Sequence, residues 1–243
     1  MHNLRPVLSF GGGVNSAALA ILLAQKGWHG HIVFCDTGAE YDETYHFLQV
    51  FDGWLSQHRL SITRLGAEYR EEHYKMPLPM AMEQYGQVPL IRARWCTTAY
   101  KIDPLRRWCT EHGYDLDADV MVGIAYDEAH RQPGKIRPLV EWRITRDMCA
   151  QIIREAGLPV PRKSGCWFCP FQSYSQLRHL FLERPDRFAW MIWIEQRASF
   201  GSGRRVTFHP DGEPMSQIAL RFRTNQPTLF DLSEFYQPCL CRV

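Results

Sequence analysis

Short runs of consecutive apolar residues alternate with segments of helical periodicity in the N-terminal half of the chain. The apolar runs of strand length occupy residues 6–10, 31–35, 60–65 and 119–124. Between the first three runs, apolar residues recur every three to four positions over 15–26 and 42–57, which predicts amphipathic helices. Strands that alternate with helices at this spacing favour a parallel α/β sheet with right-handed crossovers.

The remainder of the chain is less regular. The residues from 66 to 94 contain Pro and Gly at intervals and predict a long loop with some helix, whereas helices are expected over 101–112, 145–156 and 174–200. We therefore predict a nucleotide-binding α/β domain over 1–140. A helical, cysteine-containing segment with a basic surface would follow over 141–243 and pack on the first domain as one unit.

Composition excludes several classes of protein. The chain has 243 residues, 45% of them hydrophobic, with a net charge of +2, which is typical of a folded globular protein and not of a disordered one. It holds no apolar run of about 18 residues and no secretory-signal pattern at its start, so we expect a soluble, cytoplasmic protein without membrane contact.

The net charge conceals an asymmetry along the chain. Residues 1–130 carry 11 basic and 16 acidic side chains, while residues 131–223 carry 16 basic and 8 acidic ones. Twenty-three of the 28 basic residues are arginine, the side chain suited to bidentate phosphate contacts and to stacking on bases. The basic half is therefore either a solvated surface or a surface that binds a polyanion.

A triple glycine, Gly11 to Gly13, separates the first predicted strand from the first helix. Glycines at such a turn let the backbone approach a ligand, and the free N–H groups of the helix start then face an anion, which makes phosphate the expected ligand. The turn fits neither the P-loop nor the dinucleotide fingerprint. Asn15 or Ser16 is expected to cap the helix and Gly27 to end it.

Five segments carry a family resemblance. In chain order they are SFGGGVNS (9–16), FCDTGAEYDETY (34–45), WCTTAYKIDPL (95–105), VGIAYDEAHR (122–131) and GCWFCP (165–170). Their order resembles that of phosphoadenosine phosphosulfate (PAPS) reductases and their relatives in the PP-loop ATP pyrophosphatase superfamily, over residues 5–172. The resemblance implies a Rossmann-like, adenine nucleotide alpha hydrolase-like sheet whose first turn holds the phosphates of ATP.

The resemblance also implies site residues. The nucleotide would contact Ser9, Gly11, Gly12, Gly13, Asn15, Ser16, Asp36, Thr37 and Gly38, and the catalytic positions would be Lys101, Asp127 and Arg131. In the family the turn reads SGGxDS, so Gly11 replaces a serine and Asn15 replaces the aspartate. An amide carries no charge and is a poorer ligand for Mg²⁺ than a carboxylate, so this departure affects the expected Mg²⁺ chemistry more than nucleotide binding.

The eight cysteines fall into groups. Cys35, Cys109 and Cys149 lie among apolar neighbours in predicted helices or strands, where free cysteine acts as a small hydrophobe. The pair Cys166-x-x-Cys169 forms a tight turn that suits structural Zn²⁺, a redox dithiol or an iron–sulfur cluster. In the family members that it resembles, a cysteine at the position of Cys96 joins this pair to ligate a [4Fe–4S] cluster. The fourth iron would be open or bound by Cys239 or Cys241.

These features lead to three hypotheses about function. The first is an ATP-dependent sulfurtransferase that adenylates its substrate and inserts sulfur from a donor protein or sulfide. That substrate would be tRNA or DNA, because aromatic residues interleave the arginine-rich segment 131–223. The second is a PAPS or adenylylsulfate reductase that uses a C-terminal cysteine, and the third is a non-catalytic, zinc-containing nucleic-acid-binding module. A homodimer is possible in each case.

Overall fold

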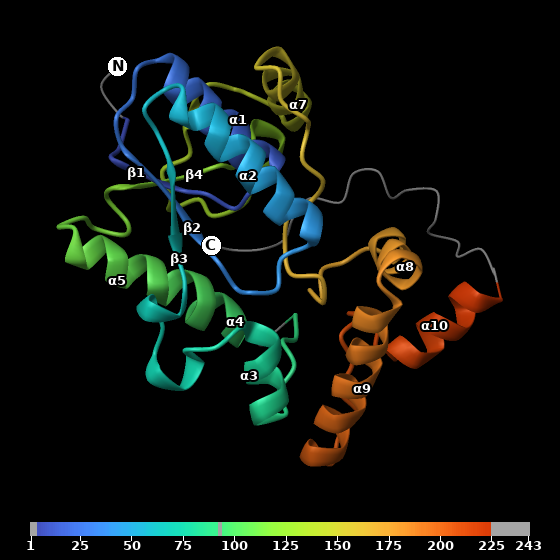
Figure 1. Ribbon diagram of the computed structural model, residues 1–243. Helices are drawn as coiled ribbons and strands as arrows, with labels where there is room; N and C mark the ends of the chain where they lie inside the picture. The colour runs from blue at the N-terminus through green and yellow to red at the C-terminus, as the bar shows by residue number, and fades with distance from the viewer. Residues whose placement is uncertain (1–3, 92–93, 225–243) are drawn as a thin grey trace.

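The computed structural model describes residues 4–91 and 94–224, so Cys239 and Cys241 lie outside the described residues. Its centre is a parallel sheet of four strands, β1 (Val7–Ser9), β2 (His31–Cys35), β3 (Ile62–Leu65) and β4 (Val120–Val122). The strand order is β3-β2-β1-β4, with Leu8 paired to Ile32 on one side and to Met121 on the other (Figure 1). The predicted α/β class is therefore confirmed.

The helices follow the predicted pattern through most of the chain. They are α1 (Val14–Gln25), α2 (Asp42–Ser56), α3 (Leu78–Tyr85), α4 (Trp95–Thr97), α5 (Asp103–Glu111), α6 (Pro138–Glu141), α7 (Arg146–Glu155), α8 (Tyr174–Glu183), α9 (Pro185–Ser202) and α10 (Met215–Arg223). The short helix α10 was not predicted, because it buries only Met215, Ile218 and Ala219 and its periodicity spans little more than one turn. Within the described parts of the chain, no helix combines the length and apolar character needed to cross a membrane.

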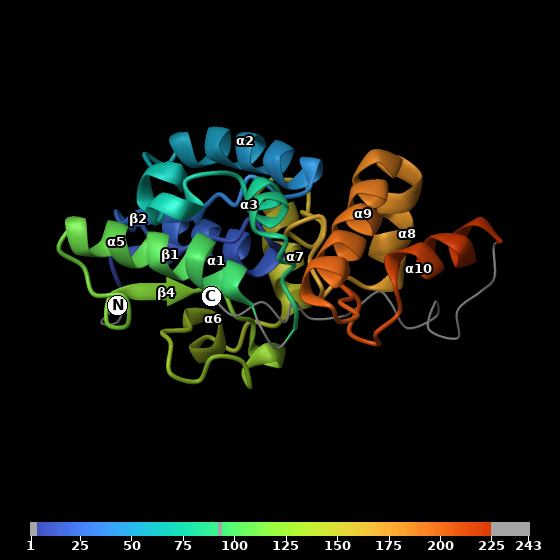
Figure 2. The same ribbon diagram turned by 90° about the horizontal axis from the view of Figure 1, so that it is seen from below.

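Alternation of side chains along the strands produces two apolar layers. Leu8, Ile32 and Phe34 belong to the cluster that includes residues of α1, α2 and α7, while Val7 and Val33 pack with residues of α5. Figures 1 and 2 show α1 and α2 on one side of the sheet and α5 on the other. The central strands are thus covered on both faces, which explains why they read as uninterrupted apolar runs.

The start of α1 differs from the prediction. The helix begins two to three residues earlier than a cap at Asn15 or Ser16 requires, with Gly13 in the N-cap position, and both side chains lie buried inside the first turn. No side chain from the described residues caps this end, so the N–H groups of the first turn remain available to a ligand. The C-terminal end agrees with the prediction, because Gly27 has a φ of +68° and terminates the helix.

A second core lies beside the carboxyl edge of the sheet. It joins buried residues of α3, α8, α9 and α10 to Trp167 and Phe168 of the CxxC turn. Helix α7 instead packs on α1 and belongs to the first core, although it lies beyond residue 140, the predicted end of the first domain.

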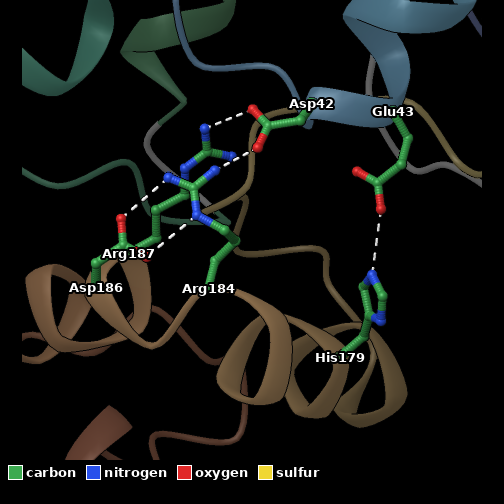
Figure 3. A network of polar contacts seen from close by, with 6 residues as sticks. All are labelled: Asp42, Glu43, His179, Arg184, Asp186 and Arg187. Carbon is green, nitrogen blue, oxygen red and sulfur yellow. Dashed lines mark hydrogen bonds and ion pairs between the residues drawn. The ribbon is translucent and has the colours of Figure 1, made fainter.

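An ion-pair network connects the start of α2 to the C-terminal helices (Figure 3). The carboxylate of Asp42 accepts hydrogen bonds from both Arg184 and Arg187, with 2.6 Å between Asp42 Oδ1 and Arg187 Nη2. Beside it, Nε2 of His179 lies 3.2 Å from Oε1 of Glu43. These side chains hold α8 and α9 against the start of α2.

Candidate functional site

A pocket forms where β1 and β4 end at the same edge of the sheet. It is lined by Ser9, Gly11, Gly13, Val14, Asn15, Ser16, Lys101, Val122, Gly123, Ile124, Glu128, Arg131, Gln132, Arg146, Lys163, Ser164 and Gly165. Four of these residues are basic, and the N-terminus of α1 opens into the same space. Cationic side chains around free backbone N–H groups are the arrangement that binds a polyphosphate, so we refer to this site as the phosphate pocket.

The three glycines of the first turn have different surroundings. No atom of the described chain lies within 4 Å of a Cβ placed on Gly11, whereas a Cβ on Gly12 would meet the side chain of Thr44 at 3.2 Å. Gly12 also has a φ of +68°, so it shapes the turn and faces the interior, and it does not line the phosphate pocket. A Cβ on Gly13 would lie 2.8 Å from Ser164 Oγ, which places this glycine against the segment before the CxxC turn.

Gly123, directly after β4, lies against the backbone of α1. A Cβ at this position would be 2.6 Å from Cα of Ser16 and 2.7 Å from its backbone nitrogen. This close approach lets the end of β4 and the first turn of α1 form one wall of the phosphate pocket. The sequence carries a signal for this contact, because a glycine at the end of a strand often marks close backbone approach.

A carboxylate at the floor of the pocket organises its polar groups. Oε2 of Glu128 accepts a hydrogen bond of 2.7 Å from Nδ2 of Asn15 and lies 3.1 Å from Nη1 of Arg131. Arg146 reaches the other side of the same amide, with 3.4 Å between its Nη1 and Oδ1 of Asn15. Two arginines and the amide are therefore oriented around one buried carboxylate.

The neighbouring acid, Asp127, has a structural role in this arrangement. Its side chain is exposed, lies outside the lining of the phosphate pocket, and accepts a hydrogen bond of 3.0 Å from the backbone N–H of Arg146 at the start of α7. Sequence reasoning selected Asp127 and missed Glu128, the adjacent residue of the same motif. It also missed Arg146 and Lys163, which reach the pocket from segments far along the chain.

The loop after β2 lies beside the turn that contains Cys166 and Cys169. Oδ1 of Asp36 accepts hydrogen bonds from the Gly38 N–H at 2.8 Å and from the Tyr45 hydroxyl at 2.7 Å, so this carboxylate holds its own loop. Thr37 lines a second pocket, described next, and neither Asp36 nor Gly38 lines the phosphate pocket. Among the positions predicted to contact nucleotide, five line the phosphate pocket (Ser9, Gly11, Gly13, Asn15 and Ser16) and Thr37 lines the second pocket, whereas Gly12, Asp36 and Gly38 line neither.

The three predicted ligand cysteines line this second pocket. Its walls are formed by Thr37, Leu78, Arg94, Cys96, Thr97, Lys101, Gly165, Cys166, Cys169, Pro170 and Phe171, and we refer to it as the cysteine pocket. The CxxC turn is held on the loop after β2 by a hydrogen bond of 3.0 Å from the Trp167 N–H to the Ala39 carbonyl. Lys101 and Gly165 line both pockets, so the two sites are contiguous.

Charged and polar groups surround the sulfur of Cys166. Burial and the carboxylate of Glu40 raise the pKa of the Cys166 thiol well above its usual value, against the opposing effects of Lys101 and of the Thr37 hydroxyl 3.4 Å away. Glu40 is itself only 1% exposed, with Nζ of Lys101 3.6 Å from its Oε1. With these neighbours the Cys166 thiol is therefore protonated at neutral pH.

The remaining described cysteines are core residues, as predicted. Burial raises the pKa of the thiols of Cys35 and Cys149 to about 12 and that of Cys109 to about 11. All three are buried, and thiols with such pKa values are unreactive at neutral pH.

Most of the aromatic side chains in the basic half are also structural. Trp167, Phe168 and Tyr174 are buried in the second core. On α9, Phe200 is 92% exposed and Trp193 is 44% exposed, with the guanidinium of Arg197 5.6 Å from the ring centre of Trp193. Only a small part of the aromatic content of residues 131–223 thus remains available for stacking on a base.

The cysteine pocket matches an iron–sulfur cluster in the chemistry of its donors. Three thiols on one pocket supply the donor type that a cluster requires. However, within residues 4–91 and 94–224 no three His, Cys, Asp or Glu side chains are grouped so that they could hold a metal ion.

Comparison with known proteins supplies the family context. The family model described as "Phosphoadenosine phosphosulfate reductase domain" matches residues 5–132 of this chain. An uncharacterized nin region protein of Escherichia phage lambda, ORF290, is 33% identical over 157 residues, which are 56% of this chain and 53% of the phage protein. Adenosine 5'-phosphosulfate reductase of Deinococcus radiodurans is 28% identical over 172 residues, 64% of this chain and 62% of that enzyme.

A solved structure is similar over a larger share of the chain. The PAPS reductase of Candida auris, crystallised as a phosphate complex, covers 69% of this chain and 82% of its own, with 18% identity and a TM-score of 0.47. The matched segment of this chain spans about half to three fifths of the length of the phage and Deinococcus relatives.

Proposed function

This chain belongs to the phosphoadenosine phosphosulfate reductase domain family, and from that premise we propose that it is an ATP-dependent sulfurtransferase. The observation that carries the proposal is the contact between the two pockets, which share Lys101 and Gly165. A nucleotide bound by its phosphates at α1 would thereby present its reacting end to the cysteines. Such proximity supplies much of the rate enhancement of a group transfer.

The phosphate pocket would activate the acceptor. An oxygen of the acceptor attacks the α-phosphorus of ATP, the bond to the β-phosphate oxygen breaks, and pyrophosphate leaves. The first turn of α1 with Arg131 and Arg146 holds the polyphosphate, and the ammonium of Lys101, at the junction of the pockets, balances negative charge that develops there. Sulfur then forms a bond to the activated carbon, and AMP departs with the oxygen.

The cysteine pocket would supply the sulfur through Cys96, Cys166 and Cys169. When bound by these thiols, a [4Fe–4S] cluster with an open iron would provide a site for sulfide. The Thr37 hydroxyl, 3.4 Å from the sulfur of Cys166, orients that sulfur, and Thr37 and Lys101 both oppose the effect of Glu40 on the pKa of the thiol.

A nucleic acid is our proposed acceptor. Its support is the exposed ring of Trp193 beneath Arg197, in a half of the chain that carries twice as many basic as acidic residues. A base stacks on such a ring while the guanidinium meets its phosphate.

The decisive experiment measures pyrophosphate and sulfite with the purified full chain. We expect pyrophosphate release from ATP that depends on a tRNA or DNA acceptor, together with incorporation of labelled sulfur into that acceptor. Sulfite release from adenylylsulfate in the presence of thioredoxin, without ATP cleavage, would contradict the proposal. That outcome would support a reductase, the second candidate, which is favoured by the similarity to the Deinococcus enzyme.

Replacing Cys166 by serine tests the cysteine pocket separately from the phosphate pocket. After anaerobic purification we expect Cys166→Ser to lose iron and acid-labile sulfide while ATP affinity changes less than about threefold, because Cys166 does not line the phosphate pocket. Cys149→Ala is the control, since that thiol lies in the first core and its loss should leave iron content unchanged.

The metal content of the wild-type protein distinguishes the remaining alternatives. One zinc per chain without iron or sulfide would rule out the cluster. Combined with failure to cleave ATP, that result would favour a non-catalytic zinc module.

A further inference from the structure

Glu128 is a buried carboxylate with one oxygen unsatisfied. It lines the phosphate pocket, yet it is only 4% exposed. Oε2 is bound by Asn15 and Arg131, whereas Oε1 finds no hydrogen-bond partner among the described residues. A buried carboxylate oxygen without a partner loses the hydrogen bonds that water would give it and is unfavourable, so this atom is a candidate contact for a ligand.

The charges around Oε1 of Glu128 restrict the chemical class of that ligand. The pocket is built for an anion, and a phosphate oxygen placed against Oε1 would be repelled by it. A divalent cation removes the conflict, because it binds carboxylate and phosphate oxygens together. Mg²⁺ in nucleotide sites is commonly held by one or two carboxylates, the phosphates and water, so a single glutamate suffices.

We propose that Glu128 is the protein ligand of a Mg²⁺ ion that enters with the phosphates of the nucleotide. This inference rests on the proposed binding of ATP in the phosphate pocket. The pairing of Glu128 with Asn15 supports this assignment. At the place where the family turn has an aspartate, this chain has an amide that donates its hydrogen bond to a carboxylate on the opposite wall. The negative charge is thus retained in the pocket but is carried by a different segment.

The positions of the amide and the carboxylate can be exchanged by mutation. In Asn15→Asp two carboxylates would stand within hydrogen-bond distance, because Asn15 Nδ2 lies 2.7 Å from Glu128 Oε2, and their repulsion would weaken the pocket. In Glu128→Gln the carboxylate is lost altogether. The double variant Asn15→Asp/Glu128→Gln restores one carboxylate and one amide with the hydrogen bond in the opposite direction.

Calorimetric titration of ATP, with Mg²⁺ and with EDTA, tests the proposal on the folded full chain. We expect Mg²⁺ to tighten ATP binding to the wild type, and Glu128→Gln to reduce that Mg²⁺-dependent gain by at least about tenfold. The double variant should recover most of the gain. Glu141→Gln, which removes an exposed carboxylate outside the pocket, should behave as the wild type. Thermal unfolding without ligand identifies any variant that fails to fold.

The outcomes separate this inference from the proposed function. ATP binding that is equally tight with Mg²⁺ and with EDTA would overturn the role of Glu128 and leave the nucleotide site intact, as would an unchanged Mg²⁺ dependence in Glu128→Gln. Failure of the folded wild type to bind ATP under either condition would overturn the proposed function and this inference with it. Recovery in the double variant, after loss in both single variants, would support the exchange of charge.

Discussion

Gly11→Asp should weaken ATP binding by roughly a hundred- to a thousandfold while leaving the protein folded. The turn has room for the side chain, since no described atom lies within 4 Å of a Cβ at this position. The new carboxylate would stand in the phosphate pocket. Two like charges about 4 Å apart interact by about 4 kcal/mol at an intermediate effective dielectric constant, which corresponds to about a thousandfold before screening.

Gly11→Ser is the matched control for this substitution. Serine is the residue that the family turn carries here, and it adds a shorter polar side chain without a charge. We expect near wild-type affinity in calorimetry for Gly11→Ser, and an unchanged unfolding midpoint for both variants. Wild-type ATP affinity in Gly11→Asp would show that the phosphates bind elsewhere. Gly12→Asp would not give this information, because its Cβ faces Thr44 and its φ of +68° is strained for any other residue.

Gly123→Ala should destabilise the protein by about 3 kcal/mol, near the upper end of the usual cost of overpacking. The added methyl group would lie 2.6 Å from Cα of Ser16 and 2.7 Å from its nitrogen. Both are backbone atoms of α1, so no side-chain rotation relieves the contact. Either β4 or the start of α1 must move, and ATP affinity should fall with stability, because both segments line the phosphate pocket.

Chemical denaturation monitored by tryptophan fluorescence gives the free energy of unfolding for this variant. Gly134→Ala is the control, because no described atom lies within 4 Å of a Cβ there and its backbone is not left-handed. We expect its midpoint to match the wild type. An unchanged midpoint for Gly123→Ala would mean that the end of β4 and α1 are further apart than the structure places them.

The sheet and its helices were predictable from the sequence, because local patterns of apolar residues indicate each of them. The apolar runs and the helical periodicity report burial of each segment separately, and they located β1 to β4 and the main helices within a few residues. The start of α1 was predicted wrongly because Asn15 and Ser16 are favourable capping residues in general. Here the helix begins at the glycine turn, and these side chains point into the structure.

Which residues line the candidate site could not be predicted from local sequence patterns. Whether Asp127 or Glu128 faces the pocket depends on one short turn after β4, and both are acidic residues of the same motif. Arg146 and Lys163 reach the phosphate pocket through the packing of α7 on α1 and through the segment before the CxxC turn. Such contacts arise from tertiary structure and leave no local pattern in the sequence.

The ion pairs between α2 and the C-terminal helices have a practical consequence. Asp42 and Glu43 lie directly after the loop that holds the CxxC turn. Asp42 pairs with Arg184 and Arg187, and Glu43 pairs with His179. The carboxylates are about half exposed, so their attraction is screened as ionic strength rises. High ionic strength would therefore weaken the contacts between α2 and the C-terminal helices. Metal retention and nucleotide affinity are comparable between variants only when they are measured at one fixed salt concentration.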